Sequence, residues 1–179
     1  MFLGLLTNNI TVGYYSAAER IFRACQYLGM PLFQALFPHF SKLIVDDKER
    51  AVRQFTKLFR IVMIVTFLIS LALSLSSHFV ISIILGAKYF QSILILQILS
   101  WVIFASWGNY CLGIQGLVNF GFEQTFSKIV LIFGALHIVL IYFGVRSFGV
   151  LAVPVIWFLT ESLIFSTEYV IVKRRKILL

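Results

Sequence analysis

Charged residues are scarce in this sequence. Only 12% of its 179 residues are charged, against about 25% in a typical soluble domain. Hydrophobic residues make up 60% of the chain, and the mean hydropathy is +0.97. This balance excludes an ordinary water-soluble domain and predicts an integral membrane protein.

Residues and motifs typical of enzymes and metal sites are also few. The two cysteines, Cys25 and Cys111, lie inside apolar stretches, which indicates small buried thiols rather than a disulfide or a metal site. No histidine has a second ligand at metal-binding spacing. The sequence contains no phosphate-cradling glycine-rich loop and no nucleophile elbow. We therefore predict a protein that is not an enzyme and that needs no cofactor or metal.

Acidic residues are outnumbered, and the formal net charge is +8. In a soluble chain such a charge would suggest nucleic acid as a partner, but here the basic residues flank apolar segments, a pattern typical of membrane orientation. One predicted side of the membrane has only Lys88 and Arg146. We predict that the other side is cytoplasmic and includes the C-terminus, because it holds 11 of the 15 basic residues: Lys42, Lys48, Arg50, Arg53, Lys57, Arg60, Lys128, Lys173, Arg174, Arg175 and Lys176.

The long apolar runs predict the fold class. They are too continuous for the alternating strands of a membrane barrel, so an all-α helical bundle follows. We expect one transmembrane domain over residues 1–179. It would hold a partial N-terminal helix over 1–6 and five full transmembrane helices, over Tyr15–Leu43, Leu58–Ser76, Phe90–Gly116, Phe126–Val145 and Val150–Val172.

Five polar or turn-rich segments separate these predicted helices, and one of them, Leu117–Phe126, is expected to be a short link. Thr7–Gly13 is expected to be a polar link, and Ile44–Arg60 an amphipathic segment lying on the membrane surface. His78–Phe90 would lie in the interface and turn at Gly86, and Arg146–Gly149 would be a tight turn.

Polar residues within the first predicted span share one face. On a helical wheel an arc of about 120° contains Glu19, Arg20, Arg23, Gln26, Tyr27, Met30, Gln34 and Pro38. A charge in the middle of a bilayer costs about 2.5–3.5 kcal/mol or more. The two arginines could reach the outer headgroups, or the face could line a cavity. Because polar residues continue deeper along the same face, we favour the cavity and predict that Arg20, Arg23, Tyr27 and Gln34 bind substrate.

Other polar residues within the spans suggest further roles. Glu19 and Arg23 have the spacing of a helical ion pair, which would leave Arg20 as the free cation, and Pro31 and Pro38 suggest a kinked helix. Glu161 lies in the middle of the last span and is either structural or a proton-coupling site, whereas Glu168 is expected at the interface. Cross-helix hydrogen bonds are expected from Asn109, Gln115 and Asn119.

Three segments together resemble a known family. They are VGYYSAAERIFRACQYLGMPLFQALFPHFSKL, ILGAKYFQSILILQILSW and FGVLAVPVIWFLTESL. In this order and spacing they resemble the bacterial O-antigen and polysaccharide flippases of the multidrug/oligosaccharidyl-lipid/polysaccharide exporter superfamily. The matching positions include Gly13, Tyr14, Pro38, Ser41 and Glu161. Where relatives often have a Gly-Ala-Ala run, this chain has Leu-Ala-Val at 151–153.

The resemblance implies a function and a larger architecture. Such proteins flip undecaprenyl-diphosphate-linked oligosaccharide across the bacterial inner membrane, for O-antigen or other surface polysaccharides. They have twelve helices in two lobes around a cationic cavity, and Arg20 and Arg23 fit that role by position. The chain matches only the C-terminal lobe, so we expect that it is truncated at the N-terminus and needs the missing N-terminal lobe. Its partners would be the lipid-linked substrate, membrane lipids and the polysaccharide polymerase and chain-length machinery.

Three alternatives remain open from the sequence. The chain could belong to a drug or metabolite antiporter of the same superfamily, although a basic face argues against cationic drugs. It could be a membrane-embedded glycosyltransferase or polymerase, but its predicted links are too short to hold catalytic groups. It could also be an inactive fragment of a transporter.

Overall fold

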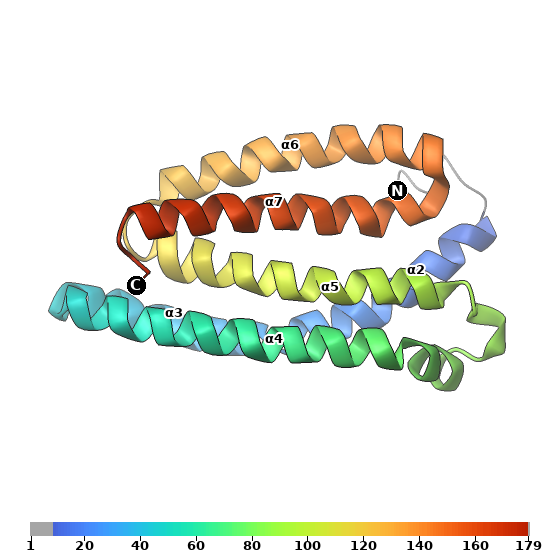
Figure 1. Cartoon of the computed structure of the whole chain (residues 1–179), viewed down its shortest axis with the longest axis horizontal. Helices are drawn as coiled ribbons and strands as arrows, with labels where there is room; N and C mark the ends of the chain where they lie inside the picture. Colours follow the sequence, from blue (N-terminus) through green and yellow to red (C-terminus); the bar gives the residue numbers. More distant parts are fainter. Residues whose placement is uncertain (1–8, 179) are drawn as a thin grey trace.

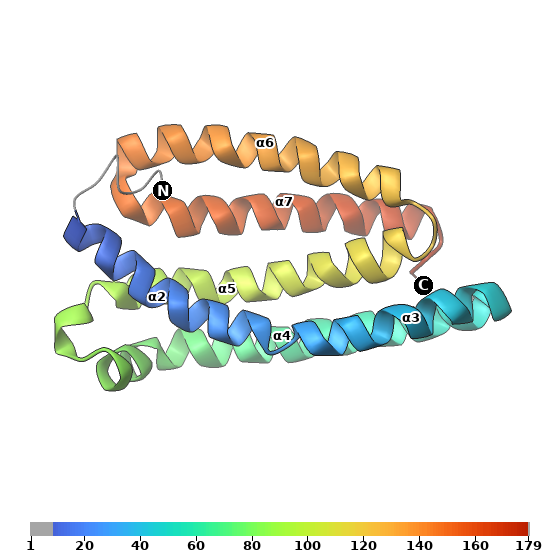
Figure 2. The ribbon, with the colours of Figure 1, turned by 180° about the vertical axis from the view of Figure 1, so that it is seen from behind.

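The computed structural model describes residues 9–178, and within them every regular element is helical. Figure 1 shows helices α6, α7, α5 and α4 lying side by side in that order. Figure 2, seen from the other side, shows α2 crossing in front of α5 and α3 lying along α4. Helix α5 is central and packs against α2, α4 and α7, while α6 packs on α7. The all-α fold class predicted from the sequence is confirmed.

The first predicted helix is two helices, α2 (Asn9–Tyr27) and α3 (Met30–Asp46). The chain breaks at Leu28 and Gly29 because Pro31 lacks an N–H, and its ring would clash with the carbonyl of Tyr27 in a continuous helix. In the first turn of α3 the same proline is well accommodated. The expected kink is therefore a full break, whereas Pro38 lies inside α3 without ending it.

Two of the predicted links are wrong. Residues 9–13 of the Thr7–Gly13 segment begin α2, while 7–8, like the predicted helix over 1–6, lie outside the described residues. The segment Ile44–Arg60 is not a surface link, because Asp47 makes a tight turn and its carboxylate caps α4 by accepting from the backbone N–H of Arg50 at 2.9 Å. A side-chain cap of this kind satisfies a free donor at a helix start.

Helix α4 (Lys48–Ile84) is far longer than the predicted second span and includes most of the segment expected at the interface. It ends at Ile84 rather than at Ser76, but the chain turns at Gly86 as expected, where a φ of 83° favours glycine. A short 3₁₀ turn, η1 (Ala87–Tyr89), leads into α5 (Ser92–Tyr110).

The C-terminal half follows the predicted spans closely. A π-helix, η2 (Cys111–Val118), continues α5, and α6 (Glu123–Phe148) follows a turn. At Gly149, with φ 69°, the short η3 (Gly149–Leu151) reverses the chain into α7 (Ala152–Arg174). The expected tight turn is present at Gly149, but the rest of the predicted segment, 146–148, is the end of α6.

Three helical stretches are long and apolar enough to cross a membrane: Lys48–Ile84, Ser92–Val118 and Glu123–Arg174. The third of these runs through both α6 and α7, which fold back on each other as a hairpin (Figure 1). The protein is thus a multi-pass, all-α membrane protein.

Two apolar clusters form the core. One joins Phe22 of α2 to Leu99 and Ile103 of α5, and the other joins Phe33 of α3 to Phe55 of α4 and to the C-terminal residues. Trp107 packs against both clusters. This ring therefore marks the junction of the two clusters, directly beside the break between α2 and α3.

Candidate functional site

A cavity of about 530 Å³ lies where α2 ends and α3 begins, between these helices and α5, α6 and α7. This volume is in the range of small-molecule binding sites. The break between α2 and α3 helps to shape it, because Gly29 is buried against Trp107. A Cβ atom on Gly29 would lie 2.3 Å from that ring, so only glycine allows this approach.

Arg23 lies at one end of the cavity. Its Nη2 and Nε donate to Oε1 of Glu19 at 2.6 and 3.0 Å, which is the ion pair predicted from their spacing. The guanidinium also lies 5.8 Å from the ring centroid of Trp157, within the range of a cation–π contact. The positive charge of Arg23 is thus held in place and partly balanced, although 44% of its side chain is exposed.

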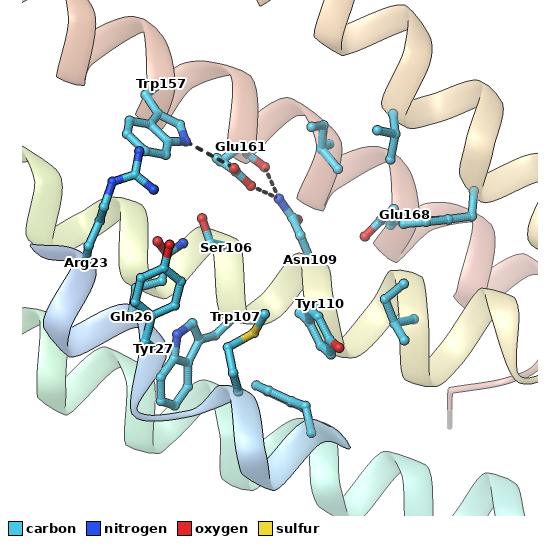
Figure 3. Close-up of a pocket in the computed structure, with 16 residues that line it drawn as sticks. Arg23, Gln26, Tyr27, Ser106, Trp107, Asn109, Tyr110, Trp157, Glu161 and Glu168 are labelled. Atoms are coloured by element: carbon cyan, nitrogen blue, oxygen red, sulfur yellow. Dashed lines mark hydrogen bonds between the residues drawn. The ribbon is translucent and has the colours of Figure 1, made fainter. Parts of the chain in front are cut away.

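Glu161 of α7 lies on the adjoining wall. Its carboxylate accepts hydrogen bonds from Asn109 Nδ2 and, at 3.2 Å, from Trp157 Nε1 (Figure 3). Asn109 Nδ2 also donates to the Glu161 backbone carbonyl at 3.0 Å. Asn109 thereby joins α5 to α7, as expected of a cross-helix amide.

The other two predicted cross-helix amides are also confirmed. Gln115, which is fully buried, donates to the carbonyl of Phe33 at 2.8 Å. Asn119 accepts from the hydroxyl of Ser41 at 2.6 Å. Helix α5 and its continuation η2 form one helical rod over Ser92–Val118, the α5–η2 rod. The two bonds hold α3 against the end of this rod and therefore fix the wall on that side of the cavity.

The structure brings some of the predicted site residues together and leaves others apart. Arg23, Tyr27 and Glu161 line the cavity, and Glu19 supports it through Arg23. Arg20 and Gln34 are exposed and do not line it. Within residues 9–178, the ion pairs are Arg23–Glu19 and Arg53–Glu49, and neither involves Arg20.

Glu168 was missed by the sequence analysis. It is fully buried and lines the cavity at the end away from Arg23 (Figure 3). Its expected place near the membrane interface stays a prediction. Its signal was its spacing from Glu161, because residues seven apart on a helix share a face. Ser106 and Trp157 are further lining residues that were not singled out as site residues.

The cysteines are free thiols: Cys111 is buried and Cys25 half-buried. Across the described part of the chain, no three His, Cys, Asp or Glu side chains gather as a metal site would require. The side chains that line the cavity thus include one cation, two carboxyl groups, amides and several aromatic rings.

Comparison with known proteins places this geometry in a family. Residues 1–94 match the family model described as "Polysaccharide biosynthesis protein". The chain is also 27% identical over 176 residues to the "Putative O-antigen transporter" of Escherichia coli K12, an alignment that covers 98% of this chain. The chain spans 42% of the length of that relative. No solved structure matches the chain. A match over more than half of its length shows that the chain belongs to the polysaccharide biosynthesis protein family, with its O-antigen and polysaccharide flippases.

Proposed function

We propose that this chain is the C-terminal lobe of a transporter that flips undecaprenyl-diphosphate-linked oligosaccharide across the bacterial inner membrane, for O-antigen or another surface polysaccharide. Its family and its similarity to a protein named as an O-antigen transporter support this role. So does the cavity, which combines an arginine with amides and aromatic rings. The role requires no bond to be made or broken, so the chain needs neither a catalytic group nor a cofactor.

The observation that carries the proposal is the position of Arg23 at the cavity wall. A guanidinium offers several donors in a fixed plane, which suits phosphate oxygens. Arg23 is presented by a helix that ends at the cavity, and Tyr27 lies one turn further along the same helix. In this proposal Arg23 and Tyr27 contact the diphosphate, and Glu161 is structural because Asn109 and Trp157 already satisfy it.

The exposed Arg20 and Gln34 have a related role in the proposal. They would contact substrate outside this cavity, on the surface where an N-terminal lobe would complete the substrate path. The curated relative is long enough to hold such a lobe, because this chain spans only 42% of it. The polysaccharide polymerase and chain-length machinery would act on the product on the outer side.

The basic residues support an orientation. Their majority lies where α3 ends, α4 and α6 begin and α7 ends, which is one end of the bundle in Figure 1. Because Lys and Arg are enriched in cytoplasmic loops, we place this end and the C-terminus in the cytoplasm. Lys88 and Arg146 are the basic residues at the opposite end.

A second candidate function is a drug or metabolite antiporter of the same superfamily. The cavity has two carboxyl groups, Glu161 and Glu168, and its arginine is already paired with Glu19. A cationic substrate would be attracted to that arrangement, so the charge of the preferred ligand separates the two candidates.

The test is ligand binding to the purified chain in detergent micelles. We expect farnesyl diphosphate, a short isoprenyl diphosphate, to bind and the uncharged alcohol farnesol not to compete. Arg23→Ala should weaken diphosphate binding about tenfold or more, because hydrogen bonds to a charged group are strong. Arg146→Ala, at the exposed far end of α6, is the matched control and should not change it. Equal binding by both variants would contradict the proposal, and tighter binding of the cation ethidium than of the diphosphate would favour the antiporter.

A further inference from the structure

Glu168 occupies the most enclosed part of the cavity wall. The residue has no exposed surface. A Cβ atom on Gly113 of η2 would lie 2.8 Å from Glu168 Oε1 and 2.5 Å from the ring of Phe126. Glycine at 113 is therefore what lets the carboxyl group fit between η2 and α6, and no space remains there for a larger side chain.

The carboxyl group of Glu168 is enclosed without a partner. Within residues 9–178, neither of its oxygens has a hydrogen-bond donor or an ion-pair partner. Two further polar atoms at this cavity, Ser106 Oγ and Asn109 Oδ1, are also enclosed and unbonded. By contrast, Glu161 accepts from two side chains. Because an ionised carboxylate enclosed without a partner costs several kcal/mol, this environment favours the carboxyl group that carries its proton.

The charges around Glu168 do not supply the missing partner. The titratable side chains at the cavity or close to the carboxyl group are Arg23 and Tyr27 of α2, Tyr110 of α5, Cys111 of η2 and Glu161 of α7. The parts of α3 and α6 that line the cavity are apolar, and α4 does not line it. The one cation in this set, Arg23, lies at the other end of the cavity and is paired with Glu19 (Figure 3). On the same helix, Glu161, of like sign when both are ionised, lies seven residues before Glu168, and the cations Lys173 and Arg174 lie in the last turn, five and six residues after it. Within residues 9–178, none of these three forms an ion pair with Glu168.

The size of the enclosure limits what can bind there. Each carboxyl oxygen of Glu168 is shut off from the cavity space. A sugar ring could not reach it without moving η2 or α6, whereas a proton adds no heavy atom to the enclosed space. A proton on the carboxyl group of Glu168 removes its negative charge and turns one of its two acceptor oxygens into a donor.

We propose that Glu168 is the proton-binding group of this cavity, and that its protonation and the binding of an anionic diphosphate favour one another. This linkage rests on the proposed function, because that function supplies the anionic diphosphate. With Glu168 ionised, two carboxylates face a diphosphate held at Arg23; with Glu168 protonated, one of these charges is removed. Linkage of this kind is reciprocal, so the bound anion also raises the affinity for the proton.

The proton site is tested without any ligand, by infrared spectroscopy of the chain in micelles titrated from about pH 5 to about pH 9, a range that spans acidic and alkaline carboxyl titrations. We expect the carbonyl band of a protonated carboxylic acid to persist at neutral pH in the wild type and to be absent in Glu168→Gln, a neutral variant of the same shape. Glu168→Asp should keep a titrating band, and Glu123→Gln, at the exposed start of α6, should leave the wild-type band unchanged. A band that survives in Glu168→Gln would overturn the proposal.

The linkage is tested with farnesyl diphosphate on the same proteins at both ends of that pH range. Removing one negative charge at the far end of the cavity should strengthen binding severalfold, because like charges that share a cavity repel each other. The acid-to-alkaline ratio of wild-type affinities should therefore exceed that of Glu168→Gln by about this factor. The diphosphate itself titrates in the same way in both samples, so a difference between the two ratios comes from the protein. Equal ratios would overturn the linkage. If no protein binds the diphosphate at any pH while the infrared band behaves as expected, the linkage and the proposed function both fail, and the proton site stands.

Discussion

The α5–η2 rod and helix α6 are both apolar, yet they occupy opposite environments. Of the 18 most apolar consecutive residues in Ser92–Val118, 56% are buried. Of the 18 most apolar consecutive residues in Glu123–Arg174, only 11% are buried. Gly108 in α5 has the ring of Phe165 where its side chain would be, whereas Gly134 in α6 has no atom within 4 Å. Hydropathy reports only that both can lie in a membrane. Small residues with close neighbours, and amides with partners, mark the helix that other helices surround.

The strongest test of this comparison exchanges glycine for leucine in each helix. Gly108→Leu should lower the free energy of unfolding by about 1–3 kcal/mol, because added methylenes in a packed interior force side chains and backbone to shift. A Cβ atom there would already lie 2.6 Å from Phe165. Unfolding by sodium dodecyl sulfate in mixed micelles measures the change.

Gly134→Leu is the matched substitution on α6. It should leave the free energy of unfolding the same or slightly raise it, since glycine is the poorer helix former. If Gly134→Leu destabilised the protein as much as Gly108→Leu, α6 would be packed on all sides and the contrast between the two helices would be wrong.

A smaller effect is expected from the amide that fastens α3 to the rod. Gln115→Leu removes the hydrogen bond to the Phe33 carbonyl and should cost about 0.6–1.7 kcal/mol, the range measured for cross-helix bonds in membranes. Gln124→Leu, on the exposed start of α6, is the control, and the same mixed-micelle titration applies. An unchanged Gln115→Leu variant would mean that the packing of Phe33 and the Ser41–Asn119 bond are enough to hold α3.

The sequence predicted the three C-terminal helices well, but the N-terminal helices and the connections less well. Apolar length marks α5, α6 and α7 within a few residues, and glycine marks the turns at Gly86 and Gly149. The prediction of a surface link over 44–60 was wrong because it relied on charge. In a sequence, charged residues at the end of a long helix show the same pattern as charged residues in a link on the membrane surface. The Asp47 cap there depends on a turn that hydropathy does not report.

The candidate site was predictable only in part. Spacing along one helix gave the Glu19–Arg23 pair and the shared face of Arg23 and Tyr27. It also placed Gln34 on that face, but the break at Gly29 separates α3 from α2, so their faces need not continue. Glu168 was missed because burial of a carboxyl group near a helix end depends on Gly113 of another helix, and the sequence does not show which helices meet.

The ion pair at the cavity entrance should matter less for stability than the buried amide. Glu19→Gln leaves Arg23 without its partner, but the two side chains are 24% and 44% exposed. Partly exposed pairs contribute about 0–1 kcal/mol, so we expect a loss within that range, and a smaller one at high salt. Glu49→Gln, which breaks the more exposed pair with Arg53, is the comparison. A loss well above 1 kcal/mol for Glu19→Gln would show that this end of the cavity is as enclosed as the rod.

The smallest effect is expected on α6 itself. His137 Nδ1 lies 3.0 Å from Thr160 Oγ1, linking α6 to α7, but the Thr160 hydroxyl also donates to the carbonyl of Ile156 at 2.8 Å. His137→Leu therefore leaves Thr160 with a partner and adds an apolar side chain on a helix whose neighbouring side chains are exposed, at 64% for Ile138. The free energy of unfolding should change by less than about 0.5 kcal/mol, as for substitutions away from buried networks. A loss as large as that of Gln115→Leu would place α6 inside the packed core, because only an enclosed polar contact is worth that much.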